Sequence, residues 1–114
     1  MNLQFVGATQ DVTGSMTIIH SEKGKILIDC GLYQGTKEEE KKNWLPLPFN
    51  PKEISAVILT HAHLDHSGYI PRLVKLGFRG SIFCTPPTMK LAKIIMSDSA
   101  KLMEAEATGT RTPF

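Results

Sequence analysis

The run ISAVIL at residues 54–59 constrains the fold of this chain more than any other segment. It is almost continuously apolar and rich in β-branched side chains. Such a run is typical of a strand that is buried on both faces, as the strands of parallel sheets are. We therefore expect a buried strand here, with the remaining elements arranged around it.

The segments before and after this strand predict the order of the elements. Mixed apolar and polar positions predict three short strands before it, at residues 2–6, 16–20 and 25–29. After it, the pattern predicts a helix at 69–76, a buried strand at 81–84 and a helix at 88–107. This order predicts an α/β fold, in which a mixed sheet has flanking helices and the loops at the strand ends bind ligands.

The last predicted helix carries an apolar stripe that we expect to pack on the core. Its members are Leu91, Ile94, Ile95, Leu102 and Met103. Asp98 falls within the stripe, where we expect a buried, hydrogen-bonded aspartate rather than a catalytic one.

Composition narrows the class of protein. A chain of 114 residues with 41% hydrophobic and 21% charged residues is typical of one globular domain. Its formal net charge of +2 is too small to indicate nucleic-acid binding by itself. We see no apolar run of membrane-spanning length and no secretion signal, so we expect a cytoplasmic protein. Cys30 and Cys84 lie far apart in the sequence and are expected to be two free thiols.

Three of the four histidines fall in the loop THAHLDHSG, which directly follows the buried strand. His61 and His63 are two residues apart, so both side chains point the same way in an extended segment. Two imidazoles on one side can hold a single divalent cation at about 2.0–2.1 Å each. The pattern therefore indicates a metal site, and the alternative is a cluster of surface histidines without a ligand.

Asp65 and His66 predict a second ligand pair next to the first. Because they are adjacent, they reach the same cavity only if the chain bends over residues 64–67, and Gly68 eases that bend. Imidazole with carboxylate suits zinc, with manganese or iron as alternatives. In such a two-metal site, Asp65 would bind a metal and accept a proton from the attacking water.

The buried strand, the THAHLDH loop and the short helix together resemble the second motif of the metallo-β-lactamase superfamily. LIDCG, at residues 27–31, resembles its first motif. The resemblance implies the N-terminal half of an αββα sandwich, with residues 1–107 as a partial domain and 108–114 as a frayed tail. It also implies that Asp29 orients the histidine loop without binding metal. From the residues alone, Asp29 is equally a turn residue before Gly31.

Longer stretches resemble the β-CASP branch of this superfamily. They are VTGSMTII, ILIDCGLYQG, THAHLDHSGYIPRLVKLGFRGSIFCT and LAKIIMSDSAKLMEAEA. This branch implies a zinc-dependent ribonuclease or RNA-processing factor that cleaves phosphodiester bonds by metal-bound hydroxide, with RNA as its partner. One alternative is an ester or thioester hydrolase of the same fold. Another is a non-catalytic truncated module.

The family's complete site implies ligands that this chain does not contain. A further histidine and a bridging aspartate lie downstream of the second motif in that family, but no histidine follows His66 and no aspartate follows Asp98. Two histidines cannot close a tetrahedral zinc shell. We therefore expect the 114-residue chain alone to be inactive. It is also expected to self-associate or to pair with a C-terminal half, because its apolar face is uncovered.

Overall fold

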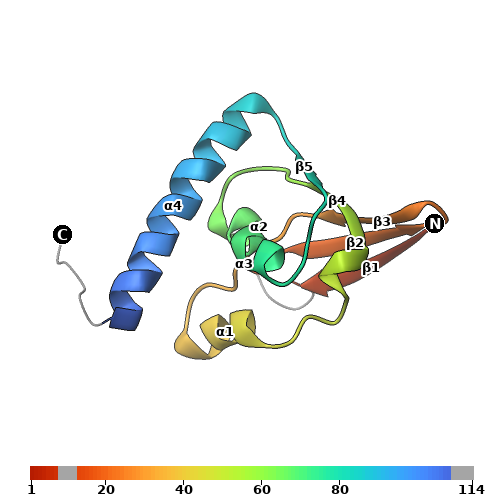
Figure 1. Cartoon of the computed structure of the whole chain (residues 1–114). Coiled ribbons are helices and arrows are strands. Elements are labelled where there is room, and N and C mark those ends of the chain that lie inside the picture. The colour runs from red at the N-terminus through yellow and green to blue at the C-terminus, as the bar shows by residue number, and fades with distance from the viewer. Residues whose placement is uncertain (8–12, 109–114) are drawn as a thin grey trace.

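Five strands form one mixed sheet in the computed structural model, which describes residues 1–7 and 13–108 (Figure 1). The strands are β1 (Asn2–Gly7), β2 (Met16–Ser21), β3 (Gly24–Ile28), β4 (Ile54–Ile58) and β5 (Ser81–Phe83). They lie in the order β1-β2-β3-β4-β5. The first three are antiparallel, and β4 runs parallel to both β3 and β5. The predicted mixed α/β sheet is confirmed.

The helices follow the strands as the sequence predicts, with short additions. They are α1 (Lys37–Lys41), α2 (Leu64–Ser67), α3 (Ile70–Lys75) and α4 (Pro86–Thr108), with 3-10 turns at Lys42–Trp44 and Pro51–Glu53. The predicted bend after the histidines is the helical turn α2. The predicted helix at residues 69–76 is α3, which ends before Gly77 at a φ of 120°. Most of the predicted frayed tail, residues 109–114, lies outside the described residues.

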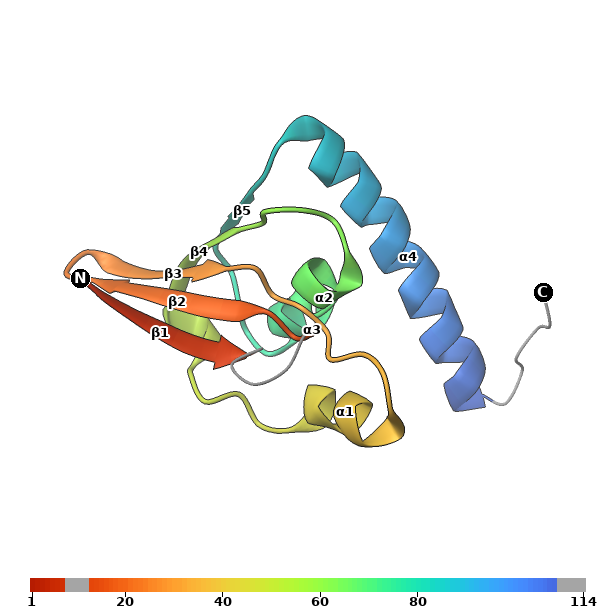
Figure 2. The same ribbon diagram turned by 180° about the vertical axis from the view of Figure 1, so that it is seen from behind.

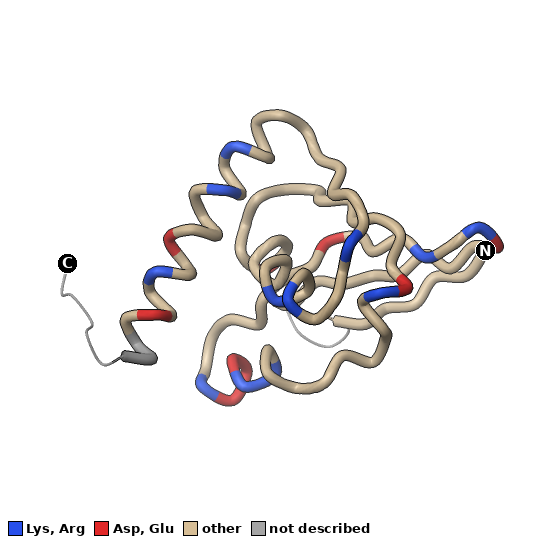
Figure 3. Tube along the Cα trace, viewed as in Figure 1, with Lys and Arg blue, Asp and Glu red and all other residues tan. Residues whose placement is uncertain are grey.

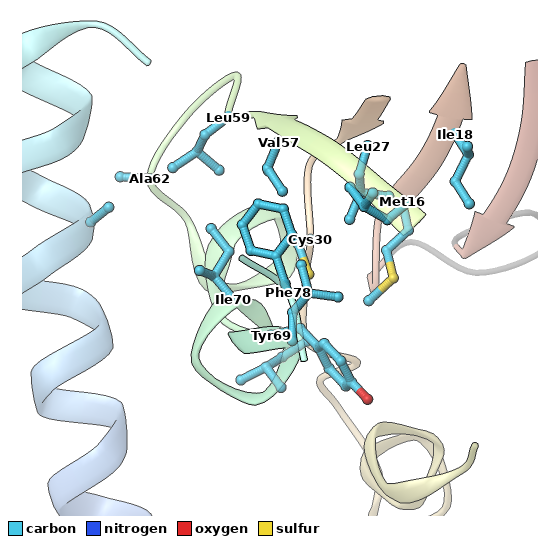
Figure 4. Packing of buried hydrophobic residues seen from close by; sticks show 14 residues of the cluster. Met16, Ile18, Leu27, Cys30, Val57, Leu59, Ala62, Tyr69, Ile70 and Phe78 are labelled. Carbon is cyan, nitrogen blue, oxygen red and sulfur yellow. The ribbon is translucent and has the colours of Figure 1, made fainter. Parts of the chain in front are cut away.

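One face of the sheet forms the core with α2 and α3. Cross-strand partners Ile18, Leu27 and Val57 occupy one row and are fully buried. Figure 4 shows these side chains directed toward Tyr69 and Phe78, on the far side of the core. Burial of this row fixes the register, since a one-residue slip would place polar side chains in the core.

The other face of the sheet is also apolar. Two rows cross all five strands, and their members are Phe5, Thr17, Ile28, Ile58 and Phe83 in one row, and Leu3, Ile19, Ile26, Ala56 and Ser81 in the other. Neither row contains a charged residue. Figure 2 shows β1, β2 and β3 from this side with no described helix in front of them. Phe5 is 67% exposed and Phe83 is 59% exposed.

Four expectations about burial are wrong. The strand β4 was expected to be buried on both faces, but Ile58 on its outer face is 40% exposed. The other strand predicted to be buried, β5, is exposed throughout because it is the edge strand of the sheet. Most of the apolar stripe on α4 is also exposed, with Leu91 at 53% and Ile94 at 60%. This helix packs against α2 and otherwise leans away from the sheet, so only Ala92 is buried on it among the described side chains (Figure 1). Asp98 is therefore exposed rather than buried.

The charged segment after β3 contains a short helix, α1, that the sequence pattern did not reveal. The hydroxyl of Thr36 accepts a hydrogen bond from the Glu39 backbone N–H at 3.2 Å and so caps the helix. Acidic side chains in the first turn of α1 also stabilise it, because they interact favourably with the positive end of the helix dipole. Figure 3 shows positive and negative residues interspersed along α1 and α4, so neither helix presents a single sign of charge. Within the described residues, no helix has the length and apolarity needed to cross a membrane.

Replacing Leu27 by alanine is expected to destabilise the fold by about 2–5 kcal/mol, because it leaves a cavity in a fully buried row. Urea denaturation followed by circular dichroism measures this change. Ile58→Ala is the matched control, since Ile58 belongs to the opposite face of the same sheet and is 40% exposed. Equal losses for the two variants would contradict the assignment of the core face.

The two cysteines are free, as predicted, and should differ in reactivity. Burial raises the pKa of the Cys30 thiol far above its ordinary value, and the neighbouring Asp29 carboxylate raises it further. Because the thiolate is the nucleophile, Cys30 should resist alkylation in the folded chain. Cys84 is only partly buried.

Iodoacetamide at neutral pH is therefore expected to modify one thiol in the native chain and both after denaturation, as counted by mass spectrometry. The Cys84→Ser variant should remain unmodified until it is denatured. Equal labelling rates for Cys30 and Cys84 in the native chain would contradict this prediction.

Candidate metal centre

The histidine loop begins where β4 ends, at the carboxyl edge of the parallel strands. The Leu59 N–H still donates to the Phe83 carbonyl at 2.9 Å, and the chain then leaves the sheet. The carbonyl of His63 accepts from the N–H groups of His66 and Ser67, both at 2.9 Å. This turn of α2 carries Asp65 and His66 back toward the two preceding histidines.

The loop brings three of the predicted ligands into one group. One ligand atom each of His61, His63 and Asp65 lies within 4.8 Å of the others, which is a spacing that could hold a metal ion. Nε2 of His66 lies 3.5 Å from Oδ2 of Asp65. The rings of His61 and His66 are 3.9 Å apart between centroids. Asp65 therefore lies beside members of both predicted pairs, and the division into two metal sites stays a prediction.

Asp29 lies beneath the loop and is 4% exposed. Its Oδ1 accepts from the Thr60 backbone N–H at 2.8 Å, and its Oδ2 lies 2.7 Å from Nδ1 of His66 and 2.8 Å from the Thr60 hydroxyl. Its backbone φ of 60° lies in the left-handed region, at the point where β3 ends. Several donors therefore compensate a carboxylate that burial would otherwise disfavour.

Backbone hydrogen bonds fix the same loop to the ends of β2 and β3. The Ser15 N–H donates to the Asp65 carbonyl at 3.0 Å, and the Cys30 N–H donates to the His66 carbonyl at 2.7 Å. Gly31 lies so close that a Cβ on it would be 1.7 Å from the Asp65 carbonyl oxygen. Only glycine permits this approach of the two chain segments.

Sequence reasoning missed two supporting side chains, Thr60 and Ser67. The hydroxyl of Ser67, which is fully buried, donates to the carbonyls of Ala62 and His63 at 2.9 and 3.1 Å. Thr60 holds Asp29, as described above. Both flank the histidines directly, so their position in the loop was the available signal, but serine and threonine are too common in loops for that signal to stand alone.

The fourth histidine, His20, lies at the opposite end of the sheet. It pairs with Lys25 at the start of β3, whereas the loop lies beyond the end of that strand. Its Nε2 is 2.7 Å from the side-chain oxygen of Gln4. Within one chain, His20 therefore belongs to the β1–β2 pair and not to the ligand group.

Comparison with known proteins places this loop in a family. The family model for the metallo-beta-lactamase superfamily matches residues 9–80. Ribonuclease TTHA0252 of Thermus thermophilus is 44% identical over 98 residues, which is 86% of this chain and 22% of that protein. Transcription termination factor FttA of Methanococcus maripaludis is 34% identical, over 96% of this chain and 17% of that protein. The chain thus spans about a fifth of the length of these curated relatives.

Solved structures agree on the fold. A metallo-beta-lactamase from Cronobacter sakazakii matches with a TM-score of 0.52 and 28% identity, over 75% of this chain and 30% of that one. Human tRNase Z, short form, matches with a TM-score of 0.53 and 23% identity, over 88% of this chain and 41% of that one. The matching family model covers more than half of the sequence, including both motifs. The chain therefore belongs to the metallo-beta-lactamase superfamily.

Proposed function

We propose that the loop binds zinc through His61, His63, Asp65 and His66, with Asp29 orienting the loop from beneath. The donor set supports this, because imidazole and carboxylate are borderline ligands that suit zinc. Nitrogen and oxygen ligands at about 2.0–2.2 Å from a tetrahedral zinc ion lie about 3.3–3.6 Å from one another. One ligand atom each of His61, His63 and Asp65 lies within 4.8 Å of the other two, so these three side chains are near enough to converge on one ion.

We further propose that this chain is the N-terminal part of a β-CASP hydrolase that cleaves RNA phosphodiester bonds. The observation that carries the proposal is the 44% identity with a protein named as a ribonuclease, across a segment that contains the whole ligand loop. Bound zinc would supply a Lewis acid that activates water for attack on phosphorus. The full activity belongs to a longer protein, since the chain spans about a fifth of these relatives.

The chain's own residues have distinct roles in this proposal. His61, His63 and His66 hold the ion, and their positions are fixed by the short loop between β4 and α3. The Asp65 carboxylate belongs to the same group and lies 3.5 Å from Nε2 of His66, where it can accept a proton from an attacking water. Asp29 is 4% exposed beneath the loop, so its role is to hold Thr60 and His66 in place.

Zinc content tests the metal site directly. We expect the untagged chain to retain about one zinc ion or more after dialysis, as measured by elemental analysis, because three grouped ligands are present. His63→Ala should lose most of this zinc. His20→Ala is the matched control and should keep it, because His20 lies at the other end of the sheet. Equal zinc in the two variants, or none in the parent chain, would overturn the metal assignment.

A chimera tests the reaction. Residues 1–114 would replace the matching segment of the Thermus thermophilus ribonuclease, and cleavage of a labelled RNA would be followed by gel electrophoresis. We expect cleavage to be retained, and Asp65→Asn to lower the rate about 10²–10⁴-fold, because it removes a proton acceptor. A folded, zinc-loaded chimera that hydrolyses esters or thioesters but not RNA would contradict the assignment to RNA.

A further inference from the structure

The hydroxyl of Thr60 lies between the buried carboxylate and the first histidine of the loop. Its oxygen is 2.8 Å from Oδ2 and 3.0 Å from Oδ1 of Asp29. The same oxygen is 3.0 Å from Nδ1 of His61. The side-chain hydroxyl of Thr60 therefore joins Asp29 to Nδ1 of His61.

The protons available on Asp29, Thr60 and His61 determine which atom donates in each of these hydrogen bonds. A carboxylate only accepts hydrogen bonds, and a threonine hydroxyl has one proton to donate. The Thr60 proton therefore goes to Asp29, and the remaining lone pairs of the hydroxyl face Nδ1 of His61. That contact is a hydrogen bond only if Nδ1 of His61 carries a proton and donates it.

We propose that Thr60 is a positioning residue that holds neutral His61 in the tautomer with the proton on Nδ1 and a free lone pair on Nε2. The inference rests on the metal site proposed above, for which it specifies the ligating atom of His61. A metal binds the unprotonated imidazole nitrogen, and the hydrogen bond made by the other nitrogen selects which one that is.

Under this proposal, the Asp29 carboxylate fixes two histidines, one directly and one through Thr60. Asp29 contacts Nδ1 of His66 directly, at 2.7 Å, and reaches Nδ1 of His61 through the Thr60 hydroxyl. Both histidines then present Nε2 on the side away from Asp29. The Thr60 backbone N–H also donates to Asp29, so replacing the side chain leaves one attachment of the loop in place.

Nuclear magnetic resonance of the metal-free, ¹⁵N-labelled chain tests the tautomers without any need for activity. Two-bond and three-bond proton–nitrogen correlations at mildly alkaline pH distinguish a protonated Nδ1 from a protonated Nε2. We expect both His61 and His66 to carry the proton on Nδ1. In Thr60→Val, His61 should move toward protonation at Nε2, while His66 should stay unchanged as an internal reference.

Two further variants separate positioning from general damage to the loop. Thr60→Ser keeps the hydroxyl and should restore the His61 tautomer. Thr17→Val removes a threonine hydroxyl from the outer face of β2 and should leave both histidines as in the parent chain. In zinc titrations, Thr60→Val should bind about 10–100-fold more weakly and Thr60→Ser close to normally.

The outcomes distinguish this inference from the proposed function. A parent chain in which His61 is protonated at Nε2, or a Thr60→Val chain in which its tautomer is unchanged, would overturn the role of Thr60. Expected tautomers together with absent zinc binding would support the positioning role and refute the metal assignment.

Discussion

The contact between the Asp29 carboxylate and the histidine loop is the interaction on which the rest of the site depends. A buried carboxylate is costly unless hydrogen bonds compensate it, and removing one partner of such a group is strongly destabilising. Here the compensation comes from Thr60, at the end of β4, and from His66, on α2. The charge at the end of β3 thus fixes where the next strand stops and how the following turn is oriented. The backbone of Asp29 has a φ of 60°, in the left-handed region, directly after the last residue of β3.

The backbone reinforces the same arrangement without using any ligand side chain. The carbonyls of Asp65 and His66 accept hydrogen bonds from the N–H groups of Ser15 and Cys30, while the side chains of Asp65 and His66 contact each other at 3.5 Å. Gly31 permits the close approach that these bonds require. The ligand loop is therefore anchored to the antiparallel half of the sheet, although it emerges from the parallel half. The backbone hydrogen bonds therefore help to fix the loop without using the side chains of Asp65 and His66.

Patterns within single segments predicted most of this fold. Strand alternation and the apolar run gave the five strands to within about two residues, and the histidine spacing predicted that His61 and His63 lie together. Burial could not be predicted in the same way. The apolar residues of β5 and α4, such as Phe83 and Ile94, look like core positions from periodicity, yet they are exposed because burial depends on which neighbours are present. Thr60 was missed for a related reason, since its role depends on Asp29, which is distant in the sequence.

The outer apolar face and the ligand loop are neighbours, and this links the two features. Ile28, Ile58 and Phe83 form the last row of that face. The residues that follow this row are Asp29, Leu59 and Cys84, and the histidine loop starts directly after Leu59. Any layer that covers the row therefore also lies beside the loop. One covering layer would therefore remove the uncharged, apolar sheet face from water and would also border the proposed metal site.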